Sequence, residues 1–171
     1  MCFSDKLFKK NLTLKPKEKV VFILLLLAII AEIMFIFSNS TESAAVSSDK
    51  SGAFVTIFIE KILGIFIGEA PENLVYDVTY FIRKLAHFTE FAVLSATFSG
   101  MLSIFRLSFK KILWSASVFS FSVGCIDEFI QLFSEGRACR FSDVIIDTLG
   151  GLSGALMLVI ITCIFSHKKT L

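Results

Sequence analysis

The sequence predicts an all-α membrane protein with about four transmembrane helices packed as a bundle. Of the 171 residues, 55% are hydrophobic and only 19% are charged, and the mean hydropathy is +0.78. A soluble domain is about 45–50% apolar and about 25% charged, so this chain has more apolar surface than one core of its length can bury. The hydrophobic residues also fall into long runs, as in helices that cross a bilayer.

Charge and cysteine placement exclude several classes of function. The 17 basic and 15 acidic residues give a net charge of +2, so there is no broad basic surface and we expect no nucleic-acid partner. The four cysteines form no C-x-x-C pair, which argues against a zinc ribbon or a thioredoxin-like site. We expect no obligatory disulfide, because these cysteines are spread over apolar and polar segments alike.

The first transmembrane helix is predicted directly after a basic leader. Residues 1–19 hold six lysines, and residues 20–37 are apolar except for Glu32. At about 1.5 Å per residue this run nearly crosses the ~30 Å hydrocarbon layer, and it lacks the small-residue cleavage site of a signal peptide. Residues 38–51 are rich in Ser, Thr and Asn, so we expect a loop there.

An interfacial or re-entrant helix is predicted between the first two spans. Residues 53–68 are apolar, but Glu60 and Lys61 stand in the middle. Two adjacent charges at the bilayer centre are costly, so an interfacial or re-entrant position is favoured over a span.

Three further spans follow. The apolar helical pattern covers residues 81–105, 112–133 and 143–165. A basic turn lies within 106–111 and a polar loop within 134–142.

Orientation follows from the Lys and Arg residues that flank the spans. With four spans, one side collects six of them from the leader, three from the 106–111 turn and two from the tail at 166–171, eleven in all, and the other side collects six. Positive residues favour the cytoplasm, so we expect both termini there and a membrane domain at residues 20–165. If residues 53–68 crossed the membrane, there would be five spans and the two termini would lie on opposite sides.

Every predicted span contains an acid, and the polar residues repeat at helical spacing. The acids are Glu32, Glu90, Asp127 with Glu128, and Asp147. Arg83, His87 and Glu90 share one helix face, as do Asp127 or Glu128 with Gln131, and Asp143 with Asp147. Each such group costs roughly 2.5–3.5 kcal/mol inside a membrane, so we expect these side chains to gather in one polar cluster that opens outward.

Two interpretations of this cluster remain open. It can be structural, with Arg83 or Arg137 paired to acids so as to fix helix register, or it can be a functional site. Gly150, Gly151 and Gly154 are small residues at a spacing that lets two helix backbones approach, so we expect packing from them.

Three segments, in order, resemble the VanZ-like family of small bacterial membrane proteins. They are residues 35–40 with 47–48, residues 83–91, and residues 127–131 with 136–137 and 143–150. The likeness covers about residues 20–165. Two features depart from the family pattern: Asp147 stands where an Asn is common, and residues 138–141 replace small polar residues.

The resemblance implies a multi-pass protein of the bacterial cytoplasmic membrane with a role in the cell envelope. The family's namesake is linked to low-level resistance to the glycopeptide teicoplanin. We therefore expect the partner to be a membrane lipid or a lipid-linked envelope precursor, with a glycopeptide as a further candidate ligand.

The residues support an enzyme or a binding protein. In an enzyme, the candidate catalytic residues are His87, Glu90, Asp127 and Glu128, with His87 and a Glu as the acid/base pair. The candidate residues for binding an anionic substrate are Arg83, Lys84, Gln131, Arg137, Arg140, Asp143 and Asp147. In a variant, the four catalytic candidates hold Zn²⁺ or Mn²⁺. In a binding or shielding protein the same cluster recognises a glycopeptide or an envelope partner without turnover, and a proton-coupled transporter is less favoured.

Overall fold

The computed structural model describes residues 14–58 and 72–168, and the described chain is helical without strands. The helices are α1 (Pro16–Ser40), α2 (Ala44–Phe58), α4 (Glu72–Ser103), α5 (Phe109–Gln131) and α6 (Phe141–Lys168). Helices α1, α5 and α6 are long and apolar enough to cross a membrane. The prediction of an all-α membrane protein is therefore confirmed.

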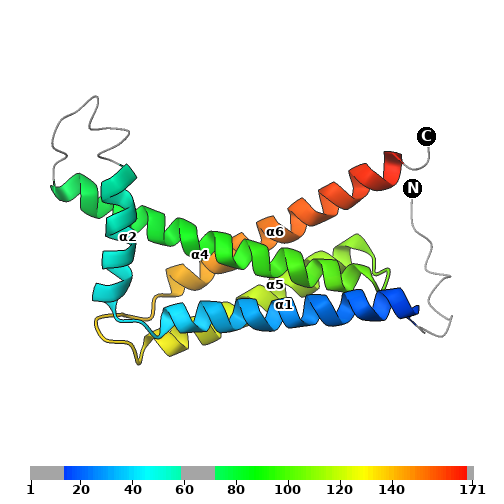
Figure 1. Cartoon of the computed structure of the whole chain (residues 1–171), viewed down its shortest axis with the longest axis horizontal. Helices are drawn as coiled ribbons and strands as arrows, with labels where there is room; N and C mark the ends of the chain where they lie inside the picture. The colour runs from blue at the N-terminus through cyan, green and yellow to red at the C-terminus, as the bar shows by residue number, and fades with distance from the viewer. Residues whose placement is uncertain (1–13, 59–71, 169–171) are drawn as a thin grey trace.

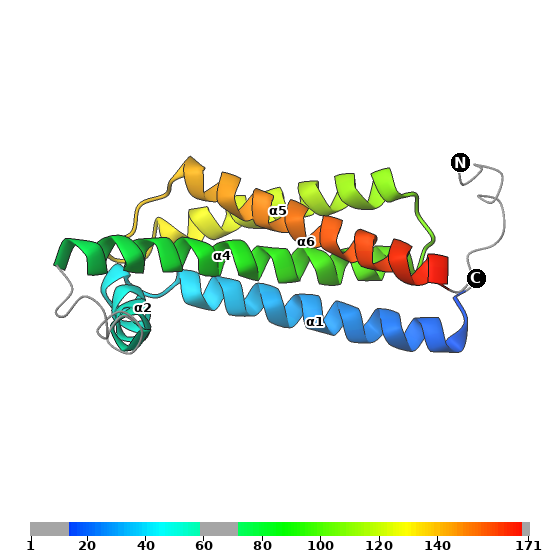
Figure 2. The ribbon, with the colours of Figure 1, turned by 90° about the horizontal axis from the view of Figure 1, so that it is seen from above.

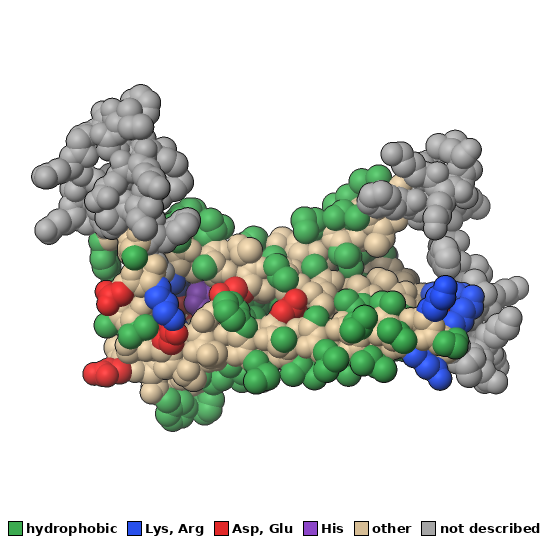
Figure 3. Space-filling view, viewed as in Figure 1, with side chains coloured by type: hydrophobic (Ala, Val, Ile, Leu, Met, Phe, Trp, Pro, Cys, Tyr) green, Lys and Arg blue, Asp and Glu red, His purple; other side chains and the backbone are tan. Residues whose placement is uncertain are grey.

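The long helices α1, α4, α5 and α6 lie lengthwise beside one another, and α2 runs across their direction at one end (Figures 1 and 2). The start of α1, the turn between α4 and α5, and the end of α6 all lie at the opposite end. Figure 3 shows basic side chains gathered there, and hydrophobic side chains along the length between the two ends. The prediction for the part of 53–68 that follows Phe58 falls outside the described residues.

Two predicted boundaries were wrong. The expected loop at 38–51 shrinks to a junction at 41–43, because α1 continues to Ser40 and α2 begins at Ala44. The Ser and Thr side chains cap helix ends here: the Thr41 hydroxyl donates to the Ser38 carbonyl at 2.7 Å, and the Ser43 hydroxyl accepts from the Val46 N–H. The helix expected from residue 81 begins at Glu72, because α4 extends beyond its apolar run.

Glycines bring α4 and α6 into backbone contact. A Cβ added to Gly150 would lie 2.3 Å from the Phe88 carbonyl oxygen, and one added to Gly154 would lie 1.9 Å from the Ala92 carbonyl oxygen. Both distances are far below van der Waals contact, so the two backbones meet where only glycine fits. The predicted packing role of these residues is confirmed.

A small apolar core lies beside this contact. Phe91 and Leu94 of α4 are fully buried against Ile36 of α1 and Val123 of α5. Phe98 of α4 stacks on Phe119 of α5, with ring centroids 4.1 Å apart. These contacts hold α1, α4 and α5 together next to the acidic residues described below.

Candidate functional site

Three carboxylic acids are buried where α5 and α6 meet α4. Asp127 and Glu128 lie near the end of α5, and Asp147 lies in the second turn of α6. Their exposed fractions are 0%, 2% and 1%. Burial this complete is costly for carboxyl groups unless they have partners, so the contacts of each one decide its role.

Asp127 is a structural member of the cluster. Its two oxygens accept hydrogen bonds from the Ser40 hydroxyl at 2.5 Å and from the Gln131 amide at 2.8 Å. The Ser134 hydroxyl donates to the Ser40 carbonyl at 2.7 Å, which ties the same place to the loop after α5. Asp127 therefore joins the end of α1 to α5, and Gln131 holds Asp127 from within α5.

Glu128 faces a small polar cavity. One of its oxygens accepts the Arg140 backbone N–H at 2.7 Å, and the other has no hydrogen-bond partner among the described residues. The cavity measures about 10 Å³, roughly the space of one water molecule. Its lining consists of Lys84, His87, Glu128, Asp143, Ile146 and Asp147.

An ion pair and an unpaired acid border this cavity. The Lys84 ammonium contacts the Asp143 carboxylate, and both side chains are mostly buried. Neither Asp147 oxygen has a hydrogen-bond partner within the described part of the chain, and one of them lies 3.5 Å from the Cβ that Gly124 would carry. His87 thus lines the same cavity as three acids and a lysine.

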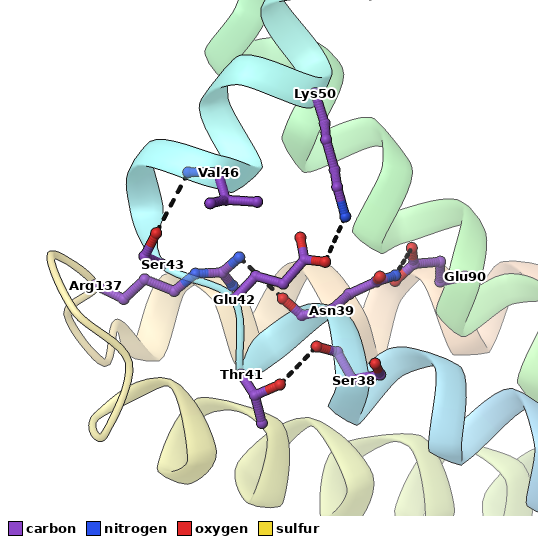
Figure 4. Close-up of polar contacts among 9 residues, drawn as sticks. All are labelled: Ser38, Asn39, Thr41, Glu42, Ser43, Val46, Lys50, Glu90 and Arg137. Carbon is purple, nitrogen blue, oxygen red and sulfur yellow. Dashed lines mark hydrogen bonds and ion pairs between the residues drawn. The ribbon is translucent and has the colours of Figure 1, made fainter.

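A second group of polar residues lies at the junction of α1 and α2 (Figure 4). The Asn39 amide donates to Glu90 Oε1 at 3.2 Å, and Arg137 Nη2 donates to the Asn39 carbonyl at 3.1 Å. In the same junction Glu42 pairs with the Lys50 ammonium. The Ala44 N–H donates to the Glu135 carbonyl at 2.9 Å, so the α5–α6 loop is bound to the start of α2.

Two guanidinium groups in this region make no direct ion pair among the described residues. Arg83 and Arg137 lie close enough to repel each other and to act on His87, and three acids lie close enough to attract Arg137. Across residues 14–58 and 72–168, neither Arg83 nor Arg137 has a carboxylate at ion-pair distance. The buried Nε–H of Arg137 also lacks an acceptor there. Burial, together with the nearby Arg83, lowers the pKa of the Arg137 guanidinium below its usual value.

The structure separates the predicted cluster into two adjacent parts. Lys84, His87, Glu128, Asp143 and Asp147 line the cavity, whereas Glu90 binds Asn39 on the side of α1. Arg140 participates through its backbone N–H, and its side chain is exposed.

Sequence reasoning did not single out Asn39, Ser40 or Ser134, each of which binds a member of the site. The signal for Asn39 and Ser40 was the Ser-Asn-Ser run at residues 38–40, inside a segment that carries the family resemblance, whereas Ser134 is one of several polar residues in the predicted loop at 134–142. Among the described residues no three His, Cys, Asp or Glu side chains are placed to hold a metal ion. The metal variant of the enzyme hypothesis therefore has no donor set in the described residues.

Comparison with known proteins identifies the family. The family model for VanZ/LLP1 matches residues 21–162, which is most of the chain and includes all of the site described above. No curated protein and no solved structure gives a significant match. The chain is a member of the VanZ/LLP1 family.

Proposed function

We propose that this protein binds the anionic headgroup of an envelope lipid or lipid-linked precursor at Arg83 and Arg137. The single observation that carries this proposal is the Arg137 guanidinium, whose buried Nε–H has no acceptor and which lies beside Arg83, with neither arginine in a direct ion pair among the described residues. A guanidinium binds phosphate or carboxylate oxygens with two parallel hydrogen bonds, and two of them together suit a phosphate. Such an anion would also relieve their mutual repulsion and accept the Arg137 Nε–H.

The membrane arrangement makes such a lipid available. In our proposal α4 also crosses the membrane, as α1, α5 and α6 do, and α2 lies at the outer interface. Both termini are then cytoplasmic in a bacterial cytoplasmic membrane. Basic side chains gather at the end that holds the start of α1 and the end of α6, which favours that end as cytoplasmic (Figure 3). Arg83 and Arg137 then lie near the outer headgroups.

If the protein modifies the bound headgroup, His87 is the residue that would transfer the proton. Its ring shares the small cavity with Glu128, whose Oε1 has no partner among the described residues, so the two form the best-placed acid/base pair. Asp127 and Glu90 are held by side-chain hydrogen bonds and position the neighbouring helices instead. In the second candidate function the protein binds or shields its target without turnover, and the structural bonds of these two acids favour that alternative.

Binding is tested with glycerol phosphate as a soluble headgroup probe on the full chain in lipid nanodiscs, by isothermal titration calorimetry. Arg83→Gln and Arg137→Gln are each expected to weaken binding by about tenfold to a hundredfold, because hydrogen bonds to a charged group contribute about 1.5–3 kcal/mol. The matched control is Arg106→Gln, an exposed arginine at the opposite end that lies 3.9 Å from Glu18. Equal loss in the control, or no loss at either test position, would refute the proposal.

Turnover is tested in a bacterium whose teicoplanin susceptibility depends on this protein. His87→Gln and Arg137→Lys are each introduced, and lipids and peptidoglycan precursors are compared by mass spectrometry. Loss of resistance with a changed envelope molecule supports the enzyme. Loss without any changed molecule supports binding or shielding, and unchanged resistance with both variants removes the site from either account.

A further inference from the structure

A wide apolar groove lies between α1 and α4, beside the two arginines. Its volume is about 740 Å³, within the range of about 300–1,000 Å³ that is usual for small-molecule sites. Figure 3 shows this face, where acidic side chains interrupt the hydrophobic surface. The α1 wall is formed by Ala31, Glu32, Phe35 and Ile36, and the α4 wall by Ile82, Leu85, Ala86, Thr89, Glu90 and Val93.

Two hydrogen bonds between α1 and α4 fix the width of the groove. Asn39 donates to Glu90 toward the outer end, and the Thr97 hydroxyl donates to Glu32 at 2.9 Å toward the middle of the helices. From Ile82 to Val93 the α4 wall runs for about 16 Å, at about 1.5 Å per residue. Phe35, Leu85 and Val93 are exposed, so the groove opens sideways, where a spanning helix meets lipid.

The groove is continuous with the arginine site through one residue. Asn39 accepts the Arg137 hydrogen bond with its carbonyl and donates to Glu90 with its amide. Glu90 is itself part of the groove wall. A ligand bound at Arg137 therefore has the outer end of the groove next to it.

We propose that the groove holds one hydrocarbon chain of the same anionic lipid whose headgroup binds Arg83 and Arg137. The proposal rests on the proposed function and names the ligand more closely, as a lipid recognised by headgroup and chain together. The groove is open along its length, and its volume accommodates an extended hydrocarbon chain that lies along the walls. Arg137 at its outer end, with an Nε–H that lacks an acceptor among the described residues, favours an anionic lipid over a helix from a second copy as the occupant.

The junction between headgroup and chain has its own contact. Glu90 Oε2 is buried and has no partner among the described residues, although Oε1 is bound by Asn39. An unpaired carboxyl oxygen in lipid is costly, so it favours a ligand that donates a hydrogen bond at this level. A glycerol hydroxyl or an amide N–H of the lipid supplies that donor, and the chain continues toward Glu32.

The experiment uses phosphatidylglycerol with a diazirine in one acyl chain, incorporated into nanodiscs that contain the full-length protein. Illumination attaches the chain to the nearest residues, and mass spectrometry locates them. We expect attachment at residues 31–36 and 82–93 about tenfold above that around Val118, whose exposed side chain reports contact with bulk lipid. Attachment in the groove at the Val118 level would overturn the proposal.

Ala86→Phe fills the groove from an exposed position, and Val118→Phe is the control on another outward face. Ala86→Phe is expected to reduce groove attachment about tenfold, and Val118→Phe to leave it unchanged. Ala86→Phe should also leave glycerol phosphate binding unchanged, whereas Arg83→Gln weakens it. Groove attachment that resists Ala86→Phe refutes the chain site alone, and glycerol phosphate binding that resists Arg83→Gln and Arg137→Gln refutes the headgroup site. Equal attachment of a zwitterionic phosphatidylcholine probe would overturn the claim that the lipid is anionic.

Discussion

Replacing Gly154 by Ala is expected to push α4 and α6 apart. The new Cβ would lie 1.9 Å from the Ala92 carbonyl oxygen and 2.6 Å from its carbonyl carbon. Ordinary contact begins at 3.4 Å, so the backbones must separate locally by the difference of 1.5 Å, and a carbonyl in a helix cannot turn aside. The helices then lose part of their mutual packing over the neighbouring turns.

The net cost is estimated from two opposing effects. Overpacking a well-packed contact costs about 1–3 kcal/mol or more, and a backbone clash belongs at the upper end of that range. Ala is favoured over Gly in a helix by about 1 kcal/mol. The variant should therefore lose about 2 kcal/mol, which for a chain of this size lowers the melting temperature by about 4–8 °C.

The assay is thermal unfolding of the protein in detergent, followed by circular dichroism at 222 nm. Gly100→Ala in α4 is the matched control, because the nearest atom to its new Cβ is Leu158 Cδ2 at 3.8 Å. That variant should be as stable as the parent, or slightly more stable. Equal melting temperatures for the Gly154→Ala and Gly100→Ala proteins would show that α4 and α6 do not touch through their backbones.

Two further predictions concern the buried charges. Lys84→Met should destabilise the protein by about 3–5 kcal/mol, because it leaves Asp143 mostly buried without its partner, and adding Asp143→Leu should restore most of the loss in the same melting assay. Asp147→Asn should not lower the melting temperature, because neither Asp147 oxygen accepts a hydrogen bond from the described residues. Asp127→Asn should lower it, because the new amide has one acceptor oxygen where the carboxylate accepts from both Ser40 and Gln131. Equal melting temperatures for the two Asn variants would contradict this distinction.

The hydrophobic runs located the long helices well. The bilayer requires about 20 consecutive apolar residues, so α1 and α5 begin or end within a few residues of the expected positions. The beginning of α4 could not be read in this way, because the residues before 81 mix polar and apolar types. The serines near residue 40 were ambiguous as well, because Ser favours both loops and helix ends.

Helical spacing identified which polar residues share a face, but it could not identify their partners. Arg83, His87 and Glu90 follow one another along α4, yet His87 lies at the cavity and Glu90 binds Asn39 of α1. That division depends on how α1 and α6 approach α4 from different sides. The contribution of Arg140 was equally hidden, because it comes from a backbone N–H and so does not depend on the type of side chain.

The thin attachment of α1 bears on the order in which the molecule is assembled. Only 11% of its apolar window is buried inside the protein, and α4 meets it through the core contact at Ile36 and the two hydrogen bonds that Asn39 and Thr97 make at either end of the groove. A helix that relies so little on its neighbours is stable in the bilayer as soon as it leaves the ribosome. The helix α1 can therefore pack against α4 late in assembly, after α6 has been synthesised and its glycines have packed against α4.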